Sequence, residues 1–401
     1  MLGAGMEALT HNFDNALPEA ILRALRKGFL GDVEYNQLKT CSNINEFKLV
    51  MEDTDYGADL FLMQEGQDFE VQALRMAMKE KLMNEMQFLI SNAAYPLNQF
   101  LIMILHRYQI DNVVFVIEGL KSHRSIEELM RTADPLGRFP ELKNIQPIDG
   151  DDYASLYQSV LVDLPVGVYF RKFLNEVTAG AAADENIEMT TKFISDAMQD
   201  YSLQQIQLRV KKIWLHEFYD FCQKELVGTS STMMQDLLKF ESDLMTLQII
   251  ENSRSYSGLV DARGDSERRK YISKVGYLYP DRSEQLNTAT SKNEMIAALE
   301  ATPYHAMMQK VSVGDNDRHE AESQGKTIDE VMLAEQSRRF SEAFEDGFHF
   351  GCFYAFIKLK EQEIKNVTWL AELVTMQVNR NLPGWNKYVV PFMYHNDELK
   401  D

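Results

Sequence analysis

The order of apolar and polar residues shows a long stretch of helical periodicity near the end of the chain, from Phe348 to Arg380. Its inner seam consists of aliphatic residues that recur every three or four positions: Ile357, Ile364, Val367, Ala371, Val374 and Val378. Only Lys360 interrupts this seam. A second, mostly leucine stripe runs beside it, so we expect this helix to have neighbours around much of its circumference, inside a helical bundle. Leu382-Pro383-Gly384 should end the helix, because proline cannot continue the hydrogen-bond ladder.

The rest of the chain repeats the helical pattern, and its ten prolines fall mostly between periodic segments. We therefore predict an all-α fold. The expected helices span residues 18–30, 33–39, 43–51, 69–91, 96–120, 125–131, 151–175, 187–227, 232–252 and 327 onward, with a weaker signal over 283–305. Two of them begin after Ser125 and Thr327 with a Ser/Thr-x-x-Glu signature, in which the hydroxyl and the carboxylate satisfy free backbone N–H groups.

Four segments lack this periodicity. Asp134–Pro140 contains two prolines and a glycine, and we predict a loop there that marks the clearest internal boundary. Residues 1–15 resemble a frayed terminus. Residues 312–326 are rich in Asp, Glu, Gly and Ser, and we predict an exposed loop there. Residues 254–270 are polar and locally basic, and we interpret them as a solvated loop rather than as a docking site. The basic residues there are Arg263, Arg268, Arg269 and Lys270.

A short pattern occurs three times along the chain. Arg107–Val113 aligns with Glu361–Val367 and, more loosely, with Glu241–Leu247, and each copy lies between an apolar or aromatic run and an aliphatic run. Amphipathic helices also resemble one another by chance, so triplication is a hypothesis at this point. It would give three similar helical units around a pseudo-threefold axis, in a ring or funnel. The units would be residues 16–140, 141–270 and 271–392, between a flexible start (1–15) and a tail (393–401).

The charge of the chain narrows the classes of partner. A net charge of -20 argues against nucleic acid, because phosphate binding needs clustered cations. The same charge disfavours an anionic bilayer surface and favours a basic protein surface. The three cysteines lie far apart, which indicates neither a disulfide framework nor a metal site and is typical of a reducing, cytosolic setting. The apolar run from Phe100 to Ile117 contains His106, Arg107 and Asp111, so we predict no membrane-spanning helix.

Motifs for nucleotide chemistry and for metals are weak or missing. Neither the phosphate-binding loop nor the dinucleotide fingerprint occurs, so no nucleotide hydrolysis and no cofactor is expected. His216 and Glu217 begin a zinc-like His-Glu-x-x-His motif, but Asp220 stands where the second histidine belongs, and we favour a plain helix surface.

An acidic cluster suggests a different chemistry. Asp149, Asp151 and Asp152 could hold magnesium as in all-helical prenyl-diphosphate enzymes. That reading needs a second acidic cluster, and Arg254 follows the nearest candidate, Asn252-Ser253. Carboxylates that cap the start of a helix are the favoured interpretation.

The border of the Phe348 helix contains the remaining candidates for function. Trp369 fits either the edge of the core or an interface anchor, since tryptophan is common among interface hot spots. Glu361 and Lys365 form a helix-stabilising pair four residues apart. We take as candidate interface or structural residues Trp369, Glu372, Thr368, Asn366, Glu363, Glu361, Lys365, Phe348 and His349.

The Phe348 helix also carries a family resemblance. Its sequence F-H-F-G-C-F-Y-A-F-I-K-L-K-E-Q-E-I-K-N-V-T-W-L-A-E resembles the last long helix of subunit d of the V-type ATPases, a family that includes the equivalent stalk subunit of the archaeal A-type enzymes. Further motifs follow the order of that family: F-D-N-A-L-P-E-A-I-L-R-A-L-R-K-G-F-L, D-T-D-Y-G, M-K-E-K-L, A-Y-P-L, Y-Q-I-D-N-V-V, P-L-G-R-F, V-L-V-D-L-P and Y-L-Y-P. The resemblance departs at residues 178–215, which look longer than usual, at 312–326, and at the tail 393–401.

The resemblance implies a non-catalytic adaptor. It implies a funnel of three units on the cytosolic face of vacuolar, endosomal or other acidic-organelle membranes, fixed to the proteolipid c-ring and holding the central stalk subunits D and F. Torque from ATP hydrolysis elsewhere would pass through it to move protons. The alternatives are a magnesium-dependent helical enzyme, based on Asp149, Asp151 and Asp152, and a free-standing helical scaffold.

Overall fold

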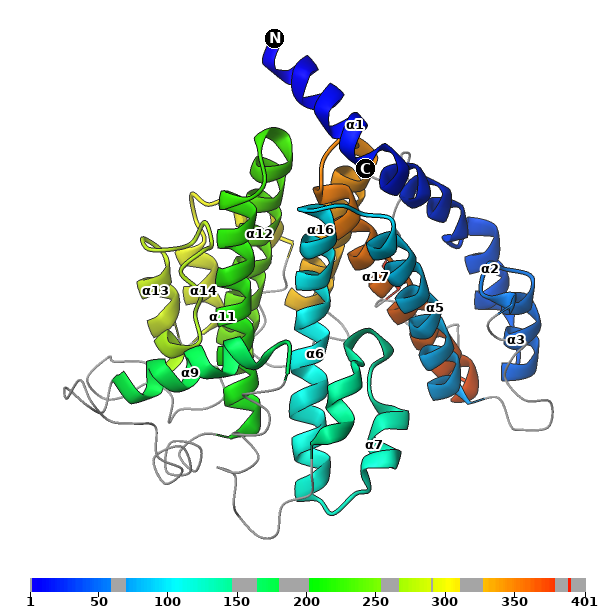
Figure 1. Ribbon diagram of the computed structural model, residues 1–401. Helices are drawn as coiled ribbons and strands as arrows, with labels where there is room; N and C mark the ends of the chain where they lie inside the picture. The colour runs from blue at the N-terminus through cyan, green and yellow to red at the C-terminus, as the bar shows by residue number, and fades with distance from the viewer. Residues whose placement is uncertain are drawn as a thin grey trace.

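The computed structural model describes residues 2–58, 70–145, 164–179, 202–253, 267–289, 291–310, 327–378 and 389–390. All regular elements in these ranges are helical, which confirms the all-α prediction for them (Figure 1). The longer helices are α1 (Leu2–Leu25), α2 (Asp32–Thr40), α3 (Ile44–Glu52), α5 (Val71–Ser91), α6 (Leu97–Lys121), α7 (Ile126–Thr132), α9 (Gly167–Ala179), α11 (Leu203–Lys224), α12 (Gly228–Ser253), α16 (Ile328–Asp346) and α17 (Gly351–Thr375). Shorter elements are η1 (Arg26–Gly28), η2 (Pro135–Gly137), η3 (Pro140–Asn144), η5 (Glu267–Lys270), α13 (Ser283–Thr288), α14 (Lys292–Ala298) and α15 (His305–Met308).

Helix α17 is the predicted central helix, and it is buried along most of its length. It packs against α16, α5, α12, α3, α1 and α6, so the prediction of neighbours around its circumference is confirmed. It is shorter than expected, because Gly347 and Phe348 adopt positive φ angles of 65° and 57° that separate α16 from α17. It also ends at Thr375, before the predicted stop, and that stop lies outside the described residues.

Helix α6 is the apolar segment that the sequence suggested would not cross a membrane. Among the described residues it is the one helix long and apolar enough to do so, with a mean hydropathy of 1.5 over its best window. In the structure 78% of that window is buried within the protein. Figure 1 shows α6 between α11 and α12 on one side and α5 and α17 on the other. Packing against α5, α11 and α17 accounts for its apolar character.

A second, smaller core lies apart from the main one. It forms where the C-terminal half of α12 and the start of α16 meet α13, α14 and α15. Tyr304 and Phe240 stack at its centre, with ring centroids 6.2 Å apart. Residues 283–305, whose helical signal was weak, therefore form short helices around a small core of their own.

Several boundaries differ from the sequence prediction. Helix α1 begins at Leu2, so Pro18 lies inside it rather than at its start. The predicted loop at Asp134–Pro140 does end α7, but it includes the short helix η2, which is buried against α5 and α6. The hydroxyl caps are confirmed, because Ser125 and Thr327 accept from the N–H groups of Glu128 and Glu330. The Glu330 carboxylate also accepts from the Thr327 N–H, whereas the Glu128 carboxylate pairs with Arg124. The segments 146–163, 180–201, 254–266 and 311–326 lie outside the described residues.

Candidate functional site

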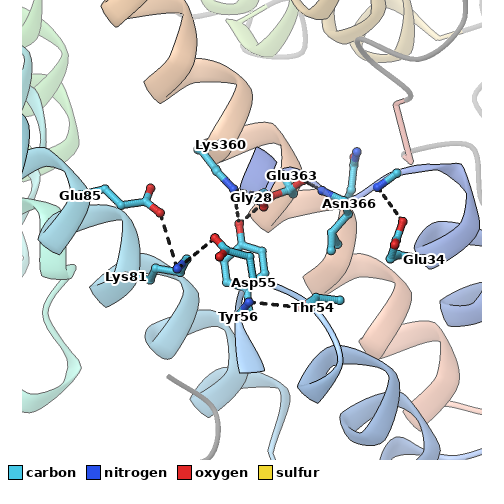
Figure 2. Close-up of polar contacts among 12 residues, drawn as sticks. Gly28, Glu34, Thr54, Asp55, Tyr56, Lys81, Glu85, Lys360, Glu363 and Asn366 are labelled. Atoms are coloured by element: carbon cyan, nitrogen blue, oxygen red, sulfur yellow. Dashed lines mark hydrogen bonds and ion pairs between the residues drawn. The ribbon is translucent and has the colours of Figure 1, made fainter. Parts of the chain in front are cut away.

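Lys360, the residue that interrupts the apolar seam of α17, is the centre of a buried polar cluster (Figure 2). Its side chain is 1% exposed. The ammonium group donates to the Gly28 carbonyl at 2.8 Å, to the Tyr56 hydroxyl at 3.2 Å and to the Glu363 carboxylate at 3.0 Å. It also lies 4.4 Å from the centre of the Phe29 ring. A charge buried this deeply is stable only when it is paired and hydrogen-bonded, and all three of its donors have partners.

Glu363 completes this cluster from the same face of α17. Its carboxylate accepts from the Leu30 N–H at 2.7 Å and from the Tyr56 hydroxyl at 2.6 Å. Burial and the Glu363 carboxylate together raise the pKa of Tyr56, so this phenol stays protonated and remains a donor. The cluster thus fastens α17 to two segments that lie about three hundred residues earlier in the chain. Glu363 is an internal residue, not a surface contact.

Asn366 forms a further internal link one turn along α17. Its side chain accepts from the Val390 N–H at 3.1 Å and donates to the Val390 carbonyl at 2.8 Å. The Gln362 amide also donates to it, at 2.9 Å. The Asn366 side chain therefore satisfies both the N–H and the carbonyl of Val390, which lies beyond the helix. This places Asn366 among the structural candidates.

The opposite side of α17 holds a second buried cluster, centred on Glu241 of α12. Lys358 lies 2.7 Å and Arg107 of α6 lies 3.5 Å from this carboxylate, and Tyr354 donates its hydroxyl to it. Burial raises the pKa of Glu241, but Lys358 and Arg107 lower it by more, so its pKa lies below the usual value. This cluster joins α6, α12 and α17 at one point.

The first residues of the three segments aligned in the sequence lie at or near this second cluster. Arg107, Glu241 and Glu361 are the first residues of the three aligned segments. Arg107 pairs with Glu241, and its positive charge also lowers the pKa of Glu361, together with Lys358 and Lys365, against the opposing effect of burial. A cavity of about 380 Å³ opens beside Arg107 and Glu241, between α12 and α16. Arg107 thus lies close to both Glu241 and Glu361.

Trp369 lies on another side of α17, facing α5. With Thr368 and Glu372 it lines a cavity of about 270 Å³, which Arg75 and Lys79 of α5 close on the other side. Trp369, Thr368 and Glu372 are all half-buried, whereas Lys365, at the edge of the same cavity, is exposed. Glu361 lines it as well, so the structure brings five of the nine candidate residues together in one groove.

Phe348 and His349 lie away from that groove, in the turn between α16 and α17. Phe348 is 53% exposed, and its N–H donates to Glu19 of α1 at 3.0 Å. His349 is buried. The nine predicted residues therefore occupy three places: the groove at Trp369, the internal clusters of α17, and this turn.

The metal hypotheses find no support in the described residues. No group of three or more His, Cys, Asp or Glu side chains lies close enough there to hold a metal ion. His216 instead hydrogen-bonds to Ser273 at 3.0 Å, and Glu217 pairs with Lys172 at 2.6 Å. The acidic cluster at Asp149, Asp151 and Asp152 lies outside the described residues.

The interpretation of the basic segment as solvated is wrong for Arg268. This side chain is 2% exposed and donates to three backbone carbonyls, those of Ser253, Asn287 and Ala289, at 2.7–3.1 Å. It organises the smaller core instead of facing water. Arg263 lies outside the described residues, while Arg269 pairs with Glu284 at the surface.

Sequence reasoning missed the partners of these clusters. Arg107, Glu241 and Lys358 were not recognised as interacting residues, and neither was Tyr56. One signal was available: a lysine inside an otherwise aliphatic seam, as at Lys360, has to find a buried acid or lie at a surface.

The comparisons with known proteins agree with one another. The model of the ATP synthase (C/AC39) subunit family matches residues 18–383. The chain is 31% identical over 371 residues to V-type proton ATPase subunit d2 of Arabidopsis thaliana, covering 92% of this chain and 95% of that protein. It is 30% identical over 383 residues to V-type proton ATPase subunit d of Dictyostelium discoideum, covering 96% of each. It is 27% identical over 386 residues to the Saccharomyces cerevisiae subunit d, covering 96% of this chain and 99% of that protein.

Proposed function

Because the chain belongs to the ATP synthase (C/AC39) subunit family and matches V-type proton ATPase subunit d over nearly its whole length, we propose that it is the non-catalytic central-stalk adaptor of such a pump. In this role it joins the stalk subunits D and F to the membrane proteolipid ring. Rotation driven by ATP hydrolysis elsewhere passes through it, and the ring moves protons. It would act on the cytosolic face of acidic-organelle membranes, as a peripheral protein held there through the complex.

The meeting of Arg107, Glu241 and Glu361 carries this proposal. If one helical unit was triplicated, equivalent positions should gather near a common axis, and the closeness of Arg107 to both Glu241 and Glu361 supports this. Their helices α6, α12 and α17 come from the three units proposed from the sequence. The contact supports a body of three units around a pseudo-threefold axis, a shape suited to holding a stalk.

Transmission of torque needs a body that does not deform, and the buried clusters supply such stiffness. Lys360 with Glu363 and Lys358 with Glu241 are ion pairs whose members are each at most 7% exposed. Separation of either pair would leave an unpaired charge in a poorly polar interior, so each pair fixes the relative position of the segments that it joins. Three of these four residues lie on α17, and Glu241 lies on α12; α17 also packs against α1, α3 and α6.

The groove at Trp369 is the proposed contact for a partner protein of the pump. Half-buried tryptophan beside charged residues is typical of interface anchors, and Glu372, Thr368 and Lys365 share its groove. Glu363 and Asn366 instead serve the rigidity of the adaptor. Glu361 lines this groove and also a smaller cavity of about 60 Å³ beside Arg107 and Lys358, so it links the proposed contact to the second cluster.

Trp369→Ala tests this proposal, with Trp369→Phe as the matched control that keeps an aromatic ring. The assay measures ATPase activity and proton uptake in membranes that contain each variant. We expect Trp369→Ala to lower assembly, or proton uptake per ATP hydrolysed, while Trp369→Phe retains most of both. Unchanged assembly and coupling in Trp369→Ala would remove the groove from the proposal.

The two alternatives are separated from the adaptor role by purification. The Arabidopsis, Dictyostelium and yeast relatives are all named as pump subunits, which does not favour a magnesium-dependent enzyme. A pull-down from detergent-solubilised membranes should recover the proteolipid and stalk subunits together with this chain. Their absence would favour a free-standing scaffold.

A further inference from the structure

One end of the molecule has a cavity that none of the roles above uses. It has a volume of about 380 Å³ and lies where the turns that precede α6, α12 and α17 meet α1. Figure 1 shows the turns between α5 and α6 and between α11 and α12 at the upper end of the view. The cavity is therefore built from four separate parts of the chain, held by packed helices.

The charged residues that line this cavity are acidic. Asp14, Glu225 and Asp346 come from three different elements, and all three side chains are exposed. None of the described lining residues is Lys or Arg. The nearby Arg23 is held by the Phe344 carbonyl and by Glu19. The cavity thus presents negative charge from three directions, with no cation among its lining residues to neutralise it.

Exposed apolar side chains surround the same opening. Val227 is 79% exposed and Phe348 is 53% exposed, and both line the cavity. Tyr95 is 63% exposed and donates its hydroxyl to Glu225 at the rim. Phe348 also has a positive φ of 57°, which is unusual for a bulky residue and holds its ring at the surface. Exposed apolar groups that adjoin a cavity are typical of binding surfaces.

The most informative group is His349, which also lines the cavity. It is 1% exposed, and neither of its ring nitrogens has a hydrogen-bond partner among the described residues. His11, at the same cavity, instead pairs with Glu19 at 2.9 Å. Burial lowers the pKa of His349, so its ring is neutral near pH 7 and offers one acceptor nitrogen. A buried acceptor without a donor costs stability, unless a ligand supplies that donor.

We propose that this cavity binds a Lys or Arg side chain from a basic, partly apolar segment of a partner protein. The apolar stem of such a side chain fits between Val227 and Phe348, as long cationic side chains commonly place their stems against apolar surface. Its charged end reaches the acidic lining and donates to the free nitrogen of His349. Three carboxylates without a lining cation favour this occupant over an anionic or neutral one. The inference rests on the adaptor role, to which it adds a specific contact and the chemistry of that contact.

Site-directed photo-crosslinking in assembled membranes tests this site. In one version, the full chain carries benzoyl-phenylalanine in place of Phe348. A separate control version carries it in place of Leu49, which is 62% exposed on the distant α3. Mass spectrometry identifies the crosslinked peptide. The version with the probe at Phe348 is also made with Glu225→Lys and Asp346→Lys together. As a matched control it is made with Glu118→Lys alone, which reverses the charge of an exposed acid at the other end of α6.

We expect the Phe348 position to crosslink to a partner peptide with Lys or Arg within a few residues of the attachment point. Glu225→Lys with Asp346→Lys should reduce the yield about tenfold, because like charges then face each other, while Glu118→Lys should leave it unchanged. His349→Phe should also lower the yield. These acids are exposed, so their reversal tests the site even where His349→Phe fails to fold.

Three results would overturn the proposal: a crosslinked peptide without basic residues, a crosslink to a second copy of this chain, or a yield insensitive to Glu225→Lys with Asp346→Lys. Free spermidine at millimolar concentration serves as a competitor. If no protein crosslinks to the Phe348 position and spermidine itself occupies the cavity, the ligand is a small polyamine, and this also contradicts the proposal. The pull-down of pump subunits described above is a separate experiment. If it recovers none of them, the adaptor role is contradicted, whereas the crosslinking result still decides whether the cavity binds a basic segment.

Discussion

Replacement of Lys360 by methionine removes one charge from the buried cluster and keeps a side chain of similar length. Glu363 would then lose its counter-ion while fully buried, with only the Leu30 N–H and the Tyr56 hydroxyl as donors, and the Gly28 carbonyl would lose its partner. Removal of one member of a buried ion pair costs about 3–5 kcal/mol in the free energy of unfolding. At an unfolding entropy of about 2.1 cal/mol/K per residue, the melting temperature of this 401-residue chain falls by about 4–6 °C.

The double variant Lys360→Met with Glu363→Gln distinguishes a charge effect from a packing effect. It removes both charges and keeps an amide oxygen that accepts from the Leu30 N–H, but the amide NH2 cannot accept from the Tyr56 O–H. The Gly28 carbonyl loses its donor in both variants, so the double variant exchanges an unpaired buried charge for one unpaired neutral donor, which costs about 1–3 kcal/mol. We expect the double variant to melt above Lys360→Met in thermal unfolding followed by circular dichroism at 222 nm. If the double variant melts lower than the single one, or if Lys360→Met melts within a degree of the wild type, the reasoning about the buried charge is refuted.

Three more predictions concern the smaller core and the second cluster. Arg268→Met should speed amide exchange in α13 and α14, because three carbonyls lose their donor, while the exposed Arg269→Met should not. Burial raises the pKa of Asp243 to about 6, so the folded state holds this proton more tightly than the unfolded one. The unfolding free energy should therefore fall by about 2.4 kcal/mol as pH rises from 4 to 7, and urea titrations of Asp243→Asn should lack this fall. Tyr354→Phe should cost about 1.5–3 kcal/mol in the same titration, since Glu241 loses a donor, and a cost near zero would contradict that bond's importance.

The sequence was a good guide where structure depends on neighbours along the chain. Helices α5, α6, α12 and α17 follow from their periodicity, and the start of α16 follows from the cap at Thr327. Even Lys360 was visible as an exception to its seam. The alignment of Arg107, Glu241 and Glu361 also pointed to residues that meet in space.

Contacts between distant segments could not be predicted in the same way. Tyr56 and Glu363 are 307 residues apart in sequence, and no local pattern links them. Arg268 lies in a polar run that looks solvated, and its burial depends on carbonyls supplied by α12 and by the residues around α13. His349 follows an exposed phenylalanine, and its lack of a partner is visible only once the turn has been folded.

The link between Lys360, Glu363 and the segment at Gly28–Leu30 has a consequence for the order in which the protein is made. A ribosome synthesises α1 to α12 long before α17. Until α17 has been made, the apolar faces of these helices that pack against it stay uncovered. Chains that stop short of residue 351 would therefore expose much of the main core and be open to aggregation or to proteolytic removal. We therefore expect the main core to close only after α17 has been made.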